Sequence, residues 1–253
     1  MTVVHRLCTA LLALALLSLS HTASSANSNG TVLITGANRG IGLALAEQFI
    51  KGGYMVIGTA RKPGSAKELK ALGAHVEQLD VTSQDSVDAL AERLGQTPID
   101  ILVNNAGIIG HDAKEFVQLD VSQLDRTMDV NLYGPLRVTQ ALLPNVYQSK
   151  TRLVTNMSSM MGSMDMNTWG CCLGYRASKS ALNSVTKTLS VDLGKQGLTF
   201  VVLHPGYVKT DMNQGQGNYT AEQSATGLFA VITGLDASDN GKFYDFQGKE
   251  LPW

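Results

Sequence analysis

Tyr175 and Lys179 are two residues whose types and spacing suit proton transfer. They lie at the start of a helical pattern over 174–193, and a spacing of four residues places both side chains on one face of a helix. A lysine cation beside a tyrosine favours the phenolate, so the pKa of the phenol can fall from about 10 towards neutral pH, as a general acid needs. The same spacing is usual in surface pairs, so a catalytic interpretation depends on further polar residues at the same place.

Polar or small residues follow three apolar segments that are predicted as strands. They are Ser158-Ser159 after 152–157, Asn104 to Gly107 after 99–103, and His204 to Asp211 after 199–203. Strands that are separated by helices and are almost continuously apolar indicate a parallel sheet covered on both faces. Because the carboxyl ends of such strands meet at one edge, the sequence predicts a ligand crevice there.

A helical pattern over 122–147 contains Gly134 and Pro135 in its interior. Proline has no backbone N–H and displaces the carbonyl of the residue four positions earlier, which is Asn131. The sequence therefore predicts a kink at Asn131 that frees its carbonyl for a water or a side chain. An ordinary bend with no functional role is the alternative.

The segment 35–42, TGANRGIG, follows the apolar run 32–34 and opens a helical pattern over 43–50. Three glycines at this spacing let the backbone turn tightly and approach a diphosphate, while the N–H groups of the new helix point at the anion. The expected ligand is a dinucleotide, and a plain loop is the alternative.

The second predicted strand, 54–60, ends at Arg61 and carries no acid there. An acid at this place accepts a hydrogen bond from the ribose 2′-OH of NAD, whereas a basic residue accommodates the 2′-phosphate of NADP. Arg61, with Arg39 in the glycine turn, therefore favours NADP(H) over NAD(H), and a solvated basic turn is the alternative. Asp80 follows the third predicted strand, 75–79, where it could bind the adenine amino group or be a plain turn residue.

The alternation of strands and helices predicts an α/β fold, a Rossmann-type, doubly wound parallel sheet of about seven strands with helices on both faces. The first and fourth strands are expected to be neighbours at the switch point. A short last strand is expected at 241–246, and the polar, glycine-rich segment 212–223 is predicted to be a mobile flap over the substrate. With 253 residues the chain can form one such domain, which is predicted over 30–253.

Residues 1–26 are predicted to be a secretory signal peptide outside this domain. Arg6 precedes an apolar run, 7–19, and small residues suited to cleavage follow at 24–26. This run of 13 residues is shorter than the roughly 20 that span a bilayer as a helix, so no permanent membrane span is expected. The protein is expected to be exported, periplasmic or secreted, if the signal is used and cytoplasmic if it is not. A disordered extension, or a wrongly assigned start codon, is the alternative.

The net charge of −1 gives no reason to expect a nucleic acid partner. No metal-ligand spacing is present, so no metal site is predicted. Cys8 is lost with the signal, and the adjacent Cys171 and Cys172 would form a disulfide only with strain. We interpret these two cysteines as packing in the loop before Tyr175, with a redox switch as the alternative.

Taken in order, these motifs resemble the short-chain dehydrogenase/reductase family over about residues 30 to 253. The match consists of the TGANRGIG turn, Asn104 to Gly107, Asn131, Ser158-Ser159, Tyr175 with Lys179, and Pro205-Gly206. Within the family, the chain is similar to the carbonyl-reductase branch that also contains the bacterial C-factor signalling proteins. That similarity lies in the segments NMSSMMGS and YRASKSALN and in the closing LPW.

The resemblance implies that Tyr175 protonates the substrate carbonyl oxygen and that Lys179 lowers the pKa of Tyr175 and binds the nicotinamide ribose. Ser159 would orient the substrate oxygen, and Asn131 would hold a water that links Lys179 to solvent. The implied cofactor-binding residues are Gly36, Asn38, Arg39, Gly40, Ile41, Gly42, Arg61, Asp80, Val81, Asn105, Ala106, Gly107, Tyr175, Lys179, Pro205, Gly206, Val208 and Thr210. Ser159 precedes Tyr175 by 16 residues, more than in much of the family, so Ser158 remains an alternative.

The predicted function is the NADPH-dependent reduction of an aldehyde or ketone to an alcohol. The alternative is an exported, C-factor-like signalling protein that binds NAD(P) with little or no catalysis. The substrate pocket is expected to come from the loops 108–117, 160–174 and 212–223. The resemblance also implies a homodimer or homotetramer, which would assemble through the helices predicted over 122–147 and 174–193.

Overall fold

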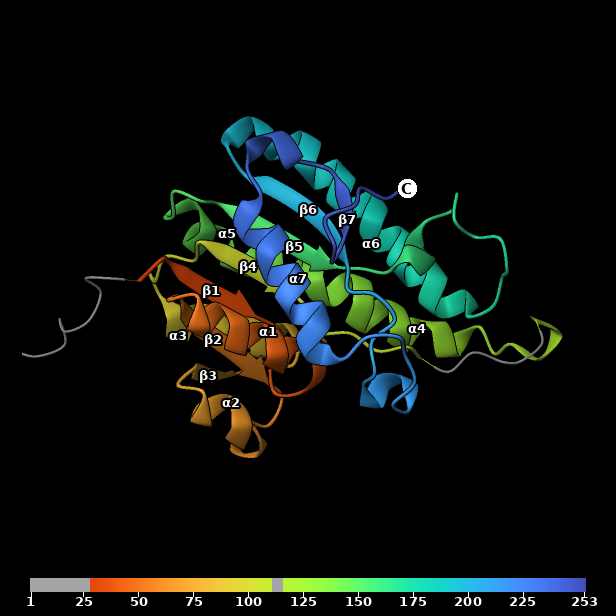
Figure 1. The fold of residues 1–253 in the computed structure, drawn as a ribbon, viewed down its shortest axis with the longest axis horizontal. Helices are drawn as coiled ribbons and strands as arrows, with labels where there is room; N and C mark the ends of the chain where they lie inside the picture. The colour runs from red at the N-terminus through yellow and green to blue at the C-terminus, as the bar shows by residue number, and fades with distance from the viewer. Residues whose placement is uncertain (1–27, 111–115) are drawn as a thin grey trace, which may run out of the picture.

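Seven parallel strands form one sheet in the order β3-β2-β1-β4-β5-β6-β7 in this computed structural model, which describes residues 28–110 and 116–253 (Figure 1). The strands are β1 (Thr31–Ile34), β2 (Met55–Ala60), β3 (His75–Gln78), β4 (Ile101–Asn104), β5 (Leu153–Met157), β6 (Thr199–His204) and β7 (Phe243–Asp245). β1 pairs with both β2 and β4, so the strand order reverses between β1 and β4, as predicted. The predicted signal peptide, 1–26, and residues 111–115 of the predicted loop 108–117 lie outside the described residues.

Helices cover both faces of this sheet (Figure 1). They are α1 (Gly40–Lys51), α2 (Lys67–Ala71), α3 (Gln84–Leu94), α4 (Ser122–Met128), α5 (Gly134–Tyr147), α6 (Leu173–Asp192) and α7 (Ala221–Gly234). α1 and α7 pack together on one face, and α3, α5 and α6 lie against the other. Within the described ranges, no helix has both the length and the hydropathy to cross a membrane. The predicted doubly wound α/β fold is confirmed.

Consecutive residues of the central strand β1 enter two different hydrophobic cores. Val32 and Ile34 pack with residues of α1 and α7, whereas Leu33 packs with residues of α3 and α5. All three side chains are fully buried, and burying a side chain of this size contributes roughly 1.5–3 kcal/mol. Because side chains alternate between the faces of a strand and both faces are covered, the strand is apolar throughout. The carboxyl end of β1 is thereby held firmly beside the glycine-rich turn.

The predicted helix over 122–147 is interrupted in its middle. α4 is followed by a π-helical turn, Asp129–Tyr133, and α5 begins at Gly134. Pro135 cannot donate a hydrogen bond to the carbonyl of Asn131, so the regular ladder of hydrogen bonds breaks there. The structure therefore has an irregular, π-helical turn at Asn131, where a kink was predicted, and a bend of the helix axis stays a prediction.

Two helices, α2 and α7, were not predicted from the sequence. α7 begins inside the segment 212–223, where a flap was predicted, because Thr220 and Gln223 form a capping box that starts the helix. The base of the remaining loop is closed by a hydrogen bond from the Lys209 N–H to the Tyr219 carbonyl (2.8 Å). The flap is therefore shorter than predicted, and its mobility stays a prediction.

Candidate active site

The glycine-rich turn between β1 and α1 packs closely against the turn that follows β4. Gly36 and Gly40 have φ angles of +66° and +56°, in the left-handed region that glycine adopts without strain. A Cβ atom on Gly42 would lie 2.5 Å from the carbonyl oxygen of Gly36 and 2.6 Å from the side-chain nitrogen of Asn105. Side chains at these positions would therefore distort the turn or fill the space above it.

The first turn of α1 can bind an anion. The first N–H groups of a helix have no partner within the helix, and its dipole places partial positive charge there. Among the described residues no side chain caps α1, and its first turn contains no acid. Together with the glycine cradle, to which Asn38 and Ile41 also belong, this end of α1 fits the diphosphate of a dinucleotide.

Thr35 joins the glycine turn to the predicted cofactor residues after β4. Its hydroxyl oxygen accepts hydrogen bonds from the N–H groups of Asn105 (2.9 Å) and Ala106 (3.0 Å). The Asn105 side chain donates in return to the Thr35 carbonyl (2.9 Å). Thr35 was not among the predicted site residues, because its partners are about seventy positions away.

The other predicted cofactor residues lie at the ends of β3 and β6. Val81 is buried after β3 and packs against Gly134 at the start of α5. Val208 is buried in the loop that follows Pro205-Gly206 after β6. Thr210 comes next to the glycine turn, with its Cγ2 3.5 Å from the position of a Cβ on Gly40. The loops after β1, β3, β4 and β6 thus belong to one edge of the sheet, as predicted.

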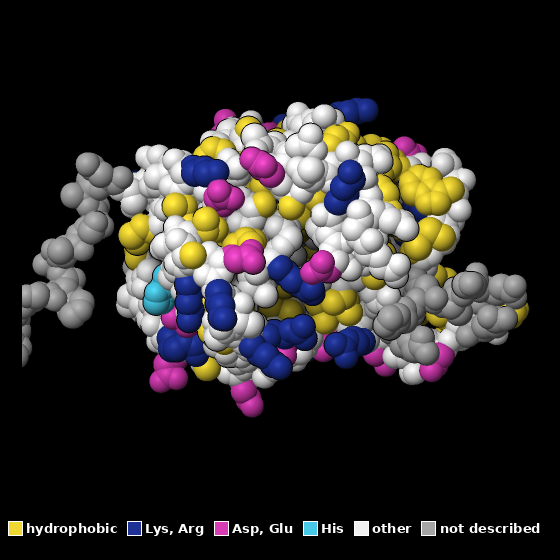
Figure 2. All heavy atoms as spheres, turned by 60° about the horizontal axis from the view of Figure 1, so that its bottom comes forward, with side chains coloured by type: hydrophobic (Ala, Val, Ile, Leu, Met, Phe, Trp, Pro, Cys, Tyr) yellow, Lys and Arg dark blue, Asp and Glu magenta, His cyan; other side chains and the backbone are white. Residues whose placement is uncertain are grey.

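Arg61 and Asp80 place charges near the ends of β2 and β3, and Arg39 places a charge on the glycine turn. Arg39 forms an exposed ion pair, with its Nη1 3.0 Å from Oδ2 of Asp211. Partial burial acts against the charged form of Asp80, but hydrogen bonds from Thr82 and the charges of Arg61 and Arg126 hold the pKa of Asp80 below its ordinary value. Figure 2 brings the lower side of Figure 1 forward and shows Lys and Arg side chains gathered there. This side suits an anionic group.

Tyr175, Lys179 and Ser159 come together beside the end of β5. Tyr175 lies in the first turn of α6, and the Nζ of Lys179 is 5.7 Å from the centroid of the Tyr175 ring. The side chains of Ser159 and Tyr175 are hydrogen-bonded to each other. The Nζ of Lys179 donates to the carbonyl of Met157 (2.8 Å), the last residue of β5. The structure therefore brings the three predicted residues together and adds the Met157 carbonyl, which the sequence did not reveal.

Burial sets the pKa values of Tyr175 and Lys179. It raises the pKa of Tyr175 to about 12, and the hydrogen bond with Ser159 only partly opposes this. It lowers the pKa of Lys179 to about 8. The pKa of Tyr175 thus lies above its ordinary value, because the loss of water around the phenolate outweighs the hydrogen bond with Ser159, and the lowering of this pKa by Lys179 stays a prediction. At neutral pH Tyr175 is thus protonated and Lys179 is mostly charged.

Asn131 lies in the π-helical turn and faces the same site. It is fully buried, and its Nδ2 donates to the Ile108 carbonyl (2.8 Å) and to Oγ of Ser178 (3.0 Å). Its Oδ1 accepts from the Ile108 N–H (2.9 Å). A Cβ on Gly107 would lie 3.3 Å from this Oδ1 and 3.7 Å from the Nζ of Lys179. The side chains of Asn131 and Lys179 therefore both lie next to Gly107, in the turn after β4.

Ser158 and Ser159 occupy different environments, although they are adjacent. Ser158 is buried, and its Oγ donates to Oδ1 of Asn183 on α6 (2.6 Å). Ser159 is hydrogen-bonded to Tyr175, and its Oγ accepts from the Met161 N–H (3.1 Å). The choice that the sequence left open is therefore decided by position, and Ser159 is the serine at the site.

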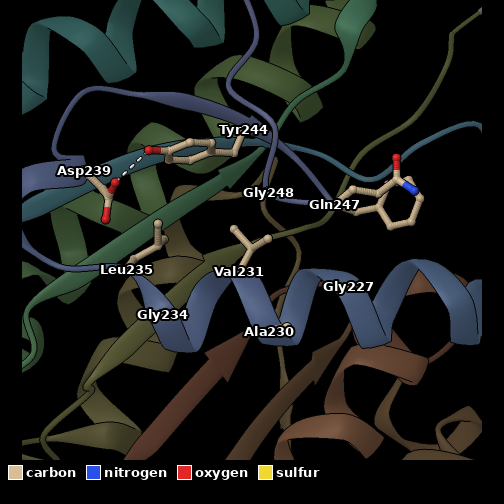
Figure 3. Close-up of a pocket in the computed structure, with 10 residues that line it drawn as sticks. Gly227, Ala230, Val231, Gly234, Leu235, Asp239, Tyr244, Gln247 and Gly248 are labelled. Carbon is tan, nitrogen blue, oxygen red and sulfur yellow. Dashed lines mark hydrogen bonds between the residues drawn. The ribbon is translucent and has the colours of Figure 1, made fainter.

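A separate groove of about 520 Å³ lies between α7 and the segment around β7. Figure 3 shows Val231 of α7 and Leu235, the residue after this helix, pointing towards the chain that carries Tyr244, whose hydroxyl donates to Asp239 (2.7 Å). None of the predicted site residues lines this groove. It is therefore distinct from the crevice predicted at the strand ends.

Comparisons with known proteins agree with this geometry. Residues 30–220 match the family model described as short chain dehydrogenase. The C-signal protein of Myxococcus xanthus is 41% identical over 165 residues, which cover 65% of this chain and 99% of that protein. The 1-hydroxy-2-glutathionyl-2-methyl-3-butene dehydrogenase of Rhodococcus sp. (strain AD45) is 37% identical, with 88% and 99% of the two chains covered.

Solved structures give the same result. The carbonyl reductase Sniffer of D. melanogaster superimposes with a TM-score of 0.82 at 33% identity, covering 90% of this chain and 100% of that chain. An NADPH-bound carbonyl reductase from chicken fatty liver has a TM-score of 0.80 at 32% identity, covering 88% and 98%. With the sheet order, the glycine turn and the Tyr175 site in place, the chain belongs to the short-chain dehydrogenase/reductase family of oxidoreductases.

Proposed function

We propose that this oxidoreductase uses NADPH to reduce a small aldehyde or ketone to an alcohol. The observation that carries the proposal is that Tyr175, Ser159, Lys179 and Asn131 come together beside the end of β5. In the sheet, only β4 lies between β5 and β1, the strand that leads into the glycine cradle. Bound NADPH would supply the hydride that goes to the carbonyl carbon.

Tyr175 is the proton donor in this proposal. Its pKa of about 12 keeps it protonated at neutral pH, so its hydroxyl donates to the carbonyl oxygen as negative charge develops there. The hydrogen bond with Ser159 holds this hydroxyl in place, and Ser159 also orients the carbonyl oxygen. The charged Lys179 would bind the nicotinamide ribose of the cofactor, and through a water held at Asn131 it would return a proton from solvent to Tyr175.

The preference for NADPH over NADH rests on the basic residues near the end of β2. Arg61 is exposed and lies close enough to Asp80 to affect its pKa, and in our proposal its guanidinium accommodates the 2′-phosphate of NADPH. Arg39 on the glycine turn adds a second cation. The NADPH-bound carbonyl reductase from chicken fatty liver supports the same choice.

The test is the oxidation of NADPH by the purified protein, followed by absorbance, with a panel of aldehydes and ketones. Tyr175→Phe removes only the hydroxyl and is expected to abolish turnover while NADPH still binds, as measured by fluorescence titration. Tyr133→Phe is the matched control, because it removes the same hydroxyl from an exposed tyrosine. Equal turnover in Tyr175→Phe and the unaltered protein would disprove the assigned role.

A second candidate function is that of an exported signalling protein that binds NAD(P) with little or no catalysis. The similarity to the C-signal protein favours it. Tight NADPH binding with no turnover on any carbonyl of the panel would support this second function. Export through residues 1–26 is tested separately, by fractionating cells that carry a C-terminally tagged chain and sequencing the N-terminus of the recovered protein.

We also propose that the chain assembles as a homodimer or homotetramer through α4, α5 and α6, as the family resemblance implies. Light scattering coupled to size-exclusion chromatography measures the mass in solution. A monomer at all concentrations contradicts this assembly.

A further inference from the structure

The loop before α6 is held in an unusual backbone conformation. Gly170, Cys171 and Cys172 are consecutive and have φ angles of +68°, +64° and +55°. The left-handed region is uncommon for residues other than glycine and persists only where the surroundings impose it. Here Nε of Arg176 donates to the carbonyls of Gly170 (2.9 Å) and Cys171 (3.1 Å), and its guanidinium stacks on the ring of Trp169 at 4.6 Å.

This conformation brings two adjacent thiols together. The Sγ atoms of Cys171 and Cys172 are 2.7 Å apart, so a movement of less than one ångström separates them from the S–S bond length of about 2.05 Å. Cys171 is exposed, and Cys172 is the residue immediately before α6. Disulfide exchange begins when a thiolate attacks a disulfide sulfur, and the exposed Cys171 is accessible to a small-molecule disulfide.

We propose that Cys171 and Cys172 are a redox-active pair that forms a reversible disulfide by exchange with a small-molecule disulfide such as oxidised glutathione. The thiolate of one cysteine attacks a sulfur of oxidised glutathione and releases one glutathione. The second cysteine then attacks this mixed disulfide, forms the Cys171–Cys172 bond and releases the second glutathione. The two protons lost by the cysteines end on the two glutathione thiols, so the protein is oxidised by two electrons and glutathione disulfide is reduced by two.

The reversibility follows from the covalent geometry of neighbouring residues. Consecutive Cα atoms are about 3.8 Å apart, which is shorter than the roughly 4.4–6.8 Å found across ordinary disulfides. Strained and exposed disulfides have higher reduction potentials and are the labile ones. The Cys171–Cys172 bond is therefore suited to forming and breaking with the surrounding thiol balance rather than to stabilising the fold.

The pair is placed to influence the proposed catalytic site. Cys172 precedes α6 directly, and Tyr175 is the third residue of that helix. Negative charge at Cys172 raises the pKa of Tyr175, which shows that the two groups interact electrostatically. Oxidation removes that charge and tightens the loop that borders the site. This consequence, unlike the disulfide itself, rests on the proposed function.

The first experiment does not depend on catalysis. The full chain carrying Cys8→Ser is incubated with oxidised glutathione and then with dithiothreitol, and its intact mass and peptides are measured. We expect a loss of two hydrogen atoms, a cross-link confined to the peptide with both cysteines, and full reversal by dithiothreitol. Cys171→Ser and Cys172→Ser should instead stop at a mixed disulfide with one glutathione. A stable mixed disulfide, or no reaction, in the chain that keeps both cysteines overturns the proposal.

The second experiment measures the link to the site. Reduced and oxidised Cys8→Ser protein are compared for NADPH binding and for KM with a carbonyl substrate, and the double variant Cys171→Ser/Cys172→Ser is treated identically. We expect KM to change at least about fivefold on oxidation, with no change in the double variant. Equal KM values in both redox states overturn the link to the site, whereas an absence of turnover in both states counts against the proposed function alone.

Discussion

Replacing Lys179 by methionine tests how strongly the fold opposes a charge at the centre of the site. Lys179 is 5% exposed, and burial lowers its pKa from 10.5 to about 8. This difference is about 2.5 pH units at about 1.4 kcal/mol each, so holding the ammonium charge in the folded protein costs about 3 kcal/mol. The cost is fully present below pH 8, where Lys179 is protonated in both the folded and the unfolded chain.

The sign of the pH dependence follows from proton binding. Between pH 8 and 10.5 the unfolded chain binds more protons at Lys179 than the folded chain, so the free energy of unfolding rises with pH. Lys179→Met abolishes this rise. It also leaves the buried Met157 carbonyl without its donor, at a cost of about 1–3 kcal/mol that does not vary with pH. Relative to the variant, the unaltered protein should therefore gain about 3 kcal/mol between neutral pH and pH 10.5.

The assay is urea unfolding followed by far-UV circular dichroism across this pH range. Lys195→Met is the matched control, because Lys195 is exposed after α6, and its stability difference from the unaltered protein should stay constant. The reasoning is refuted if the stability difference for Lys179→Met is also constant with pH. Separately, the variant should have no reductase activity at any pH, since its side chain carries no charge and donates no hydrogen bond.

Three further predictions concern the cofactor and the serine pair. Arg61→Ala removes a charge-assisted hydrogen bond and should weaken NADPH binding about ten- to a hundredfold with little change for NADH; an unchanged preference in fluorescence titrations contradicts the assignment. Ser159→Ala should lower kcat/KM on the order of a hundredfold. Ser158→Ala should instead lower the free energy of unfolding by about 1–3 kcal/mol, and the reverse pattern counts against the assigned roles. Gly42→Ala overpacks the cradle, so it should lower the free energy of unfolding in urea by about 1–3 kcal/mol and weaken NADPH binding. Gly234→Ala is the control, because a Cβ there meets no atom within 4 Å, and it should leave NADPH binding unchanged.

Local patterns in the sequence predicted the order of the main elements. Apolar runs bounded by turn residues predicted the positions of the strands. The glycines at 36, 40 and 42 predicted the cradle at the start of α1. Pro135 located the break at Asn131. Each of these signals lies in residues that are close together in the chain, as a backbone preference or a continuous apolar run, so the sequence contains the information directly. Helix α2 was not predicted because it has only five residues, too few for a helical pattern to repeat. Helix α7 was not predicted because it begins inside a polar, glycine-rich segment.

Only the tertiary structure decided how the site residues act on one another. The sequence could not separate Ser158 from Ser159, because their roles depend on which of them meets Asn183 and which meets Tyr175, both on α6. The sequence also could not give the net direction in which the pKa of Tyr175 shifts. Sequence spacing shows that a lysine is near, but the pKa depends on how much water the surrounding strands and helices exclude, and that follows from packing between distant segments.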